Sequence, residues 1–170
     1  MTDTEPMMDE AIAEDSGAGT FQTCIRTAGI ELLADEPVAA GGLGSGPTPY
    51  QLLASALAAC TTMTVRLYAT HKGWPVRRIH TAVGHDRDAK ASPPDLFTRR
   101  IEIDGDLDPD QRARLLEVAD RCPVHRTLTA GARVETSAGR SPAPAQHATA
   151  HAVDMEALIA VGRGSFDFVQ

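Results

Sequence analysis

The fold is decided by residues 48–73, which read TPYQLLASALAACTTMTVRLYATHKG. The stretch opens with a capping box, in which Thr48 is the N-cap and Gln51 the third helical residue, while Pro49 stands at the first helical position. Apolar or small residues then recur every three to four positions, which is the spacing of one buried helix face. The stretch therefore predicts a helix from Pro49 to about residue 72, with Cys60 on the face turned to a core or an interface.

The sequence on either side predicts strands and a second helix. Two short apolar runs between residues 21 and 34, separated by Ala28-Gly29, indicate a hairpin, and a loop rich in glycine and proline follows. The other expected elements are a strand at 76–85, a strand at 96–104, a helix that begins after Asp108 and a short strand at 133–136.

Cys122 lies where the second helix meets a proline. Leu115, Val118 and Ala119 share one face of that helix, and Cys122 closes the face. Because proline lacks an amide proton, Pro123 either ends this helix or starts a short new one. In the second case Cys122 is the N-cap of the new helix.

Charge and composition divide the chain into three parts. Residues 1–19 are small, acidic and without periodicity, which predicts a disordered leader. Residues 20–136 carry 14 basic and 14 acidic side chains, so this expected single domain offers no basic surface for nucleic acid or an anionic membrane. Residues 137–170 read as a linker followed by a segment with enough apolar side chains to be a docking segment.

We expect a cytoplasmic protein. No run reaches the roughly 18 apolar residues needed to cross a bilayer, and the first residues are acidic where a signal peptide is basic. The three cysteines stand at wide, unequal spacing, which does not suggest a secreted disulfide framework. In a reducing compartment, a bridge between Cys60 and Cys122 is expected to be transient and catalytic rather than structural.

The cysteines carry the expected chemistry. Cys24 is interpreted as a packing residue, whereas Cys60 and Cys122 lie where the two main helices meet and can form a redox pair. A nearby cation lowers the pKa of a thiol and supplies thiolate at neutral pH. The candidate cations are His125, Arg121 and Arg126 for Cys122, and Arg26 or Arg66 for Cys60.

No metal or cofactor is expected. Cys60, Cys122 and His125 are too few ligands for a zinc site, and no CxxC or HxxxH motif is present. The glycines before residue 48 lack the spacing of a phosphate-binding loop. One alternative for His125 stays open, namely that it acts as a general base for Cys60 in hydrolysis of an acyl substrate.

Six motifs together resemble the OsmC-like family, which includes osmotically induced protein C and the organic hydroperoxide resistance proteins. They are Asp35-Glu36-Pro37, Gly46-Pro47-Thr48-Pro49-Tyr50-Gln51-Leu52-Leu53, Ala59-Cys60-Thr61, Tyr68-Ala69, Lys72-Gly73-Trp74-Pro75 and Cys122-Pro123-Val124-His125-Arg126-Thr127-Leu128. The match spans about residues 21–136, with both cysteine motifs in order.

The resemblance implies an α+β fold, in which two long central helices are wrapped by antiparallel sheets in an intertwined homodimer. It also implies a thiol peroxidase that reduces organic hydroperoxides. By position, Cys60 is the peroxidatic cysteine and becomes a sulfenic acid, Cys122 resolves it to a disulfide, and an external dithiol resets the pair.

One departure from the family motivates a second hypothesis. In the well-studied peroxidases of the family, a Glu ten residues before the first cysteine pairs with an Arg that contacts the thiolate. That position is Tyr50 here, followed by Gln51. The candidate accessory residues are these two together with His125, Arg126 and Arg26. The alternative is a non-catalytic member that binds a small ligand or senses redox state in the same pocket.

Overall fold

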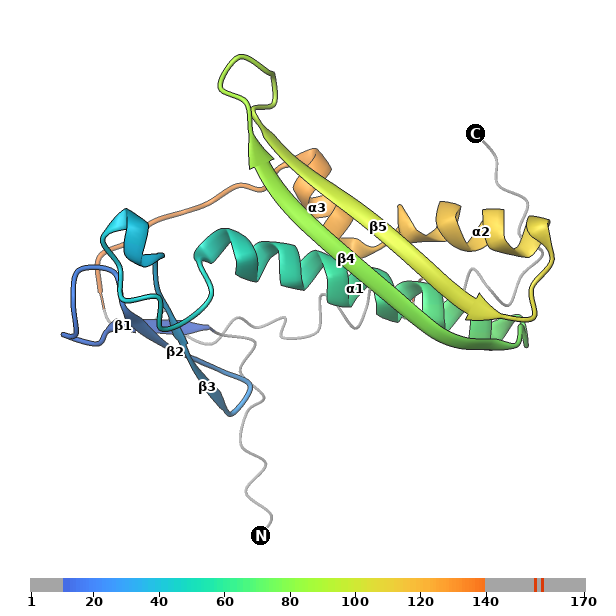
Figure 1. The fold of residues 1–170 in the computed structure, drawn as a ribbon, viewed down its shortest axis with the longest axis horizontal. Coiled ribbons are helices and arrows are strands. Elements are labelled where there is room, and N and C mark those ends of the chain that lie inside the picture. Colours follow the sequence, from blue (N-terminus) through green and yellow to red (C-terminus); the bar gives the residue numbers. More distant parts are fainter. Residues whose placement is uncertain (1–10, 140–154, 156, 158–170) are drawn as a thin grey trace, which may run out of the picture. The chain divides into compact units, whose positions relative to one another are not determined.

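The computed structural model describes residues 11–139 together with Met155 and Ala157 (Figure 1). These residues fall into two compact units, which are residues 11–52 with 135–139, and residues 53–134 with Met155 and Ala157. The sequence predicted one domain over 20–136, whereas the boundary between the two units lies just inside the long helix. Residues 1–10 of the predicted leader lie outside the described residues, and so does most of the predicted C-terminal segment.

The first unit contains a three-stranded antiparallel sheet in the order β1-β2-β3, with β1 at Ile12–Asp15, β2 at Thr23–Thr27 and β3 at Ile30–Ala34. The predicted hairpin is confirmed as β2 and β3. Its two-residue turn has φ angles of 49° at Ala28 and 73° at Gly29. Positive φ at both central residues matches the twist of the flanking strands.

Strand β1 corrects part of the predicted leader. Residues 12–15 pair with β2 in an antiparallel register that places Ile12 opposite Arg26. The Arg26 guanidinium also donates a 2.7 Å hydrogen bond to Glu14. The acidic composition suggested disorder, but pairing with a neighbouring strand supplies the backbone hydrogen bonds that a short isolated strand lacks.

The loop after β3 is organised around a buried carboxylate. Asp35 is 2% exposed and accepts hydrogen bonds from the backbone N–H groups of Glu36, Leu43 and Ser45 and from the Ser45 hydroxyl. Burial opposes ionisation, but these hydrogen bonds outweigh it and hold the pKa of Asp35 below its usual value. The loop also contains a 3-10 helix, η1, at Val38–Ala40.

Helix α1 runs over Pro49–His71, as predicted. Its capping box is present, because Gln51 N–H donates to Thr48 Oγ1 at 3.3 Å and Thr48 N–H donates to Gln51 Oε1 at 2.9 Å. With a mean hydropathy of 1.3 in its most apolar window, α1 is long and apolar enough to cross a membrane by length and composition alone. Core helices of soluble proteins meet the same criterion, so this property does not identify a membrane span.

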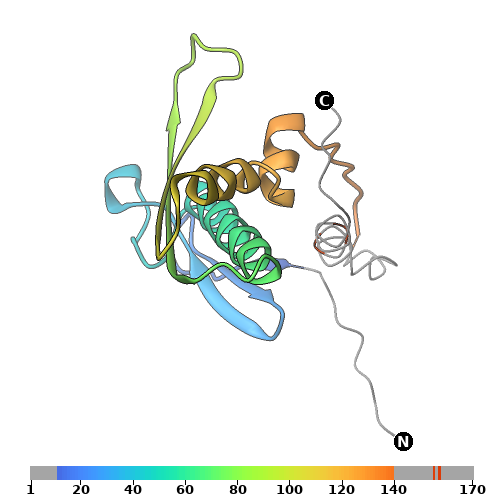
Figure 2. The ribbon, with the colours of Figure 1, turned by 90° about the vertical axis from the view of Figure 1, so that its right-hand side faces the viewer.

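The second unit contains most of α1, a long hairpin and two shorter helices. The hairpin pairs β4, Val76–Arg87, with β5, Asp95–Gly105, and the helices are α2, Pro109–Ala119, and α3, Pro123–Ala130. Both ribbon views show the hairpin running across α1 and α2 (Figures 1 and 2). Burial along β5 alternates as predicted, so Phe97, Arg99 and Ile101 face inward.

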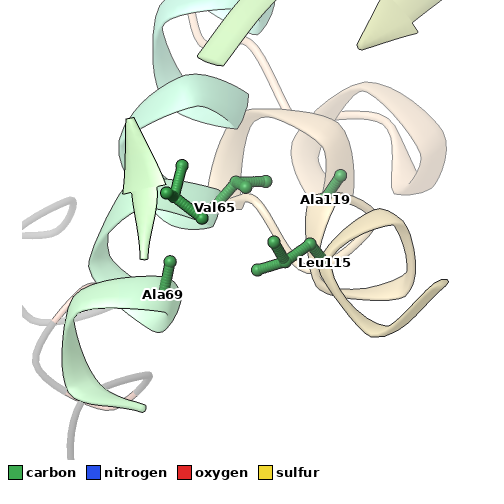
Figure 3. Close-up of a cluster of buried hydrophobic side chains, with 5 residues drawn as sticks. Val65, Ala69, Leu115 and Ala119 are labelled. Atoms are coloured by element: carbon green, nitrogen blue, oxygen red, sulfur yellow. The ribbon is translucent and has the colours of Figure 1, made fainter. Parts of the chain in front are cut away.

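The main core of this unit lies between α1, α2 and the start of β4. Its buried members are Val65, Ala69, Val76, Leu115 and Ala119. Figure 3 shows Val65 of α1 and Leu115 of α2 pointing toward each other. The small Ala69 and Ala119 complete this cluster beside the larger side chains.

The structure settles the alternative at Pro123 and overturns one predicted strand. Helix α2 ends at Ala119, and Pro123 opens the separate helix α3 with Cys122 as its N-cap. The predicted strand at 133–136 is wrong, because these residues have no regular structure. Val134 is 84% exposed, and none of the strands in the described residues pairs with it.

Candidate active site

A pair of cysteines lies at the meeting point of α1 and α3. Cys60 of α1 is 3% exposed and Cys122 at the start of α3 is not exposed. The two residues share one buried cluster, and their thiols are hydrogen-bonded to each other and ionise as a coupled pair. The facing pair predicted from helix placement is therefore present in the folded chain.

Backbone N–H groups at the start of α3 surround the Cys122 sulfur. As the N-cap residue, Cys122 accepts a hydrogen bond from His125 N–H at 3.4 Å, and Val124 N–H favours a negative charge on either sulfur. The first N–H groups of a helix have no partner within the helix and carry partial positive charge. They therefore favour a thiolate on Cys122 over a neutral thiol.

The surroundings shift the pKa values of the two thiols in opposite directions. The hydrogen bond from Cys60 lowers the pKa of Cys122 from 9.0 to about 6, against the effect of burial and with help from His125 N–H and the Thr61 hydroxyl. The same sulfur-sulfur hydrogen bond, followed by burial, raises the pKa of Cys60 well above its ordinary value. The coupled pair therefore gives up its first proton more readily than an isolated thiol does.

A buried arginine lies one hydroxyl group away from the pair. Arg99 of β5 has a side chain that is 13% exposed, and it donates hydrogen bonds to Thr61 Oγ1 and Ala119 O, each at 3.0 Å. It also forms an ion pair with Asp120 at 2.5 Å. A cation is therefore held beside Thr61, the residue that follows Cys60.

A largely apolar cavity of about 720 Å³ lies one layer of side chains away from the cysteine pair, and neither cysteine lines it. Leu57, Phe97 and Leu128 line it, and the same three side chains pack against the cysteine pair. Arg99 and His125 contribute polar groups to its wall. This size falls within the roughly 300–1,000 Å³ typical of small-molecule sites, and the cavity suits a ligand with an apolar body and one polar group.

The predicted accessory residues occupy different places. His125 reaches the pair through its backbone N–H, and its side chain lines the cavity. Arg126 lines a second, more open cavity with Pro123 and does not line the apolar one. Arg66 donates to the Val76 and Arg77 carbonyl oxygens, so its guanidinium holds the start of β4.

Three further candidates belong to the first unit. Gln51 completes the capping box of α1, Tyr50 beside it is 41% exposed, and Arg26 pairs with Glu14. The hydrogen bonds described for Gln51 and Arg26 therefore lie within the start of α1 and within the sheet, respectively.

Sequence reasoning missed Arg99, Thr61 and Asp120. The signal for Arg99 was present, because it stands between Phe97 and Ile101 on the inward side of an alternating strand. An arginine on an apolar strand face requires a buried partner for its charge. Nothing in the sequence indicated that the partners would be Thr61 and Asp120, which lie 38 and 21 positions away along the chain.

The described residues contain no group of three or more His, Cys, Asp or Glu side chains placed to hold a metal ion. The arrangement is a pair of buried, interacting cysteines near an apolar cavity. A thiolate can attack an electrophilic oxygen or sulfur, and a second thiol within reach can close a disulfide.

Comparison with known proteins agrees with this arrangement. The family model described as OsmC-like protein matches residues 42–137, more than half of the chain. No curated protein is similar enough in sequence to count as a match.

Solved structures share the fold at low sequence identity. An OsmC-like protein from Mycoplasma pneumoniae superposes with a TM-score of 0.57 at 21% identity, covering 75% of this chain and 89% of that chain. An organic hydroperoxide resistance protein, OsmC, from Legionella pneumophila gives 0.56 at 20% identity, covering 70% and 87%.

A third structure, an organic hydroperoxide resistance protein from Elizabethkingia anophelis, gives a TM-score of 0.55 at 16% identity, covering 74% of this chain and 91% of that chain. At these identities the likeness establishes the α+β fold and the match to the family model establishes kinship. The chain therefore belongs to the OsmC-like protein family.

Proposed function

We propose that this protein is a thiol peroxidase that reduces organic hydroperoxides, with Cys60 as the peroxidatic and Cys122 as the resolving cysteine. The observation that carries the proposal is the buried, interacting pair of cysteines, whose neighbours Leu57, Phe97 and Leu128 also line an apolar cavity. The family's hydroperoxide resistance members support the same chemistry. An external dithiol in a reducing compartment such as the cytoplasm resets the pair.

The cavity favours organic hydroperoxides over hydrogen peroxide. Its wall is formed by Leu57, Phe97 and Leu128, which can bury an alkyl or aryl group and gain roughly 25 cal/mol for each Å² removed from water. Hydrogen peroxide offers no such group. The hydroperoxide end of an organic substrate would then lie toward the cysteine pair.

The test is hydroperoxide-dependent consumption of dithiothreitol, measured for wild type and three single variants. We expect Cys60→Ser to abolish turnover and Cys122→Ser to accumulate a sulfenic acid on Cys60 that a dimedone-type probe labels. Cys24→Ser, which removes the half-buried cysteine of β2, is the matched control and retains turnover. Wild-type rates in Cys60→Ser would overturn the assignment.

One observation favours a second candidate function. The pKa of Cys60 is raised by the hydrogen bond it donates to Cys122 and by burial, so Cys60 by itself holds little thiolate at neutral pH. A protein of this kind could bind a small apolar ligand in the cavity, or sense redox state through the pair, without turnover. Stoichiometric binding of an apolar alcohol, with no hydroperoxide consumption, would favour this function.

We also propose that the protein acts as a homodimer. Leu53 and Met63 of α1 are 42% and 54% exposed, and exposed apolar side chains on a long helix are typical of subunit contacts. Sedimentation equilibrium tests this proposal. The expected mass is twice the 18.0 kDa of the chain.

A further inference from the structure

The cysteine pair and the apolar cavity are close to each other but closed off from each other. Cys60 is 3% exposed, Cys122 is not exposed, and neither of them lines the cavity. A molecule held in the cavity is therefore still separated from the two sulfurs by protein atoms. Chemistry between that molecule and the pair requires the intervening side chains to move.

Three side chains, one from each of three elements, form a barrier between the cavity and the pair. They are Leu57 of α1, Phe97 of β5 and Leu128 of α3, and each of them both lines the cavity and belongs to the cysteine cluster. Neighbouring side chains do only one of the two. Among the described residues, Leu96 lines the cavity outside the cysteine cluster, whereas Val83 packs in the cluster without lining the cavity.

Phe97 is the largest member of the barrier and belongs to its least supported element. Leu57 is fixed in the buried face of α1, one turn after Ala54 and one turn before Cys60. Phe97 is the third residue of β5, beside the turn of a hairpin that pairs with no other strand in the part of the chain that the structure describes. Both ribbon views show the turn end of this hairpin extending past α2 and α3 (Figures 1 and 2). A segment with few neighbours opens more readily than a packed helix.

His85 of β4 holds the Phe97 ring in place. The two residues are direct partners in the hairpin register, and their ring centroids are 4.7 Å apart at an interplanar angle of 39°. The His85 ring is in turn hydrogen-bonded to Asp95 at 2.9 Å, and Arg87 lies 3.8 Å from the same carboxylate. Asp95 also lines the cavity. The ring of the barrier is therefore connected, through His85, to a carboxylate in the cavity wall.

We propose that Phe97 is a gate between the cavity and the cysteine pair, and that His85 and Asp95 hold this gate closed. The inference rests on the proposed function, to which it adds the route from the cavity to Cys60. A turn of the Phe97 side chain to another staggered rotamer moves the ring without a change in the backbone. Phe97 then determines specificity, because the passage that its ring leaves admits narrow groups more readily than broad ones. His85 and Asp95 are positioning residues.

The test is the rate at which two maleimides of different width react with the pair, in reduced Cys24→Ser protein without hydroperoxide. N-methylmaleimide and N-phenylmaleimide share the reacting group, and mass spectrometry of the Cys60 and Cys122 peptides follows the loss of free thiols. Phe97→Ala should raise the phenyl rate by at least about tenfold, because a minor open conformer makes up roughly 0.1–10% of the molecules. The methyl rate should rise by a smaller factor.

The ratio of the phenyl rate to the methyl rate separates a gate from looser packing. A changed thiol pKa or a lower stability alters both rates together and leaves this ratio unchanged. Val83→Ala, which truncates the cysteine cluster away from the cavity, and Thr98→Ala, on the exposed face of β5, should also leave it unchanged. Phe97→Leu keeps an apolar side chain and should raise the ratio by a smaller factor than Phe97→Ala, so a poorly folded Phe97→Ala does not leave the gate untested.

A second pair of variants tests what holds the gate closed. His85→Ala should raise the ratio by less than Phe97→Ala, because the Phe97 side chain remains in the barrier. His80→Ala, at an exposed position of the same strand opposite Glu102, is the matched control and should leave the ratio unchanged. The gate is refuted if Phe97→Ala changes the ratio no more than Val83→Ala does. The role of His85 is refuted if His85→Ala behaves like His80→Ala.

This readout separates the inference from the proposed function, because it needs no hydroperoxide. A ratio that rises in Phe97→Ala, in a protein that consumes no hydroperoxide, would confirm the gate and leave the peroxidase proposal wrong. Conversely, hydroperoxide turnover that depends on Cys60, together with an unmoved ratio in Phe97→Ala and Phe97→Leu, would confirm the peroxidase and overturn the gate.

Discussion

The ionisation of the cysteine pair predicts how the rate of hydroperoxide reduction depends on pH. The reactive form has lost one proton, and the first proton leaves with a pKa of about 6, against 9.0 for an ordinary thiol. The reactive fraction is then about 10% at pH 5, about 50% at pH 6 and about 90% at pH 7. We expect the single-turnover rate to rise about ninefold from pH 5 to pH 7 and to stay level up to pH 9.

The assay mixes reduced Cys24→Ser protein with excess cumene hydroperoxide, quenches with acid at set times and counts the remaining thiols. Circular dichroism at each pH confirms that the fold is retained. A pair with the ordinary thiol pKa would be about 1% reactive at pH 7 and about 50% at pH 9. A rate that climbs about fiftyfold between pH 7 and pH 9 would therefore refute the reasoning.

Two predictions concern stability and are read from urea unfolding. Leu115→Ala, at a fully buried position between α1 and α2, should lower the free energy of unfolding by about 2–5 kcal/mol. Leu116→Ala, at a position 49% exposed, should lower it by less than about 1 kcal/mol. Equal losses for the two variants would contradict the assigned core. Gly42→Ala should destabilise strongly, because its Cβ would lie 1.9 Å from the Glu36 carbonyl oxygen, whereas Gly84→Ala meets nothing within 4 Å and should be nearly neutral. A neutral Gly42→Ala would contradict the described loop.

Local signals accounted for most of the elements that were predicted correctly. The capping box at Thr48 and the alternation along β5 depend on residues close in sequence, so they can be recognised without tertiary contacts. Strand β1 was missed for the opposite reason. Its acidic sequence is a poor strand former alone, and it is ordered by pairing with β2.

The site was predicted in outline but not in its electrostatics. Helix periodicity and the family motifs predicted that Cys60 and Cys122 lie close together. Pro123 was compatible with Cys122 as an N-cap residue but also with a simple helix end, and the structure shows the N-cap. The polar surroundings of the pair depend on contacts between distant elements, such as the hydrogen bond from Arg99 of β5 to Thr61 of α1. Such contacts have no periodic signal in the chain.

The structure also changed the question about activation. Neither Tyr50 nor Arg26 is described against the sulfurs, and both belong to the unit that holds the β1-β2-β3 sheet. The Cys122 sulfur instead accepts a backbone N–H at the N-terminus of α3, and Arg99 is bonded to Thr61, the residue after Cys60. The groups that the structure places next to the two sulfurs include the start of α3 and lie in the unit that contains both cysteines.

The central claim, that Cys60 and Cys122 together reduce a hydroperoxide, is tested most directly by stoichiometry. Reduced Cys24→Ser protein receives one equivalent of cumene hydroperoxide without any reductant, and free thiols, residual hydroperoxide and cross-linked peptides are then measured. The account predicts that two thiols are lost for each hydroperoxide consumed and that Cys60 and Cys122 are joined by a disulfide. Unchanged hydroperoxide with both thiols still free would contradict it.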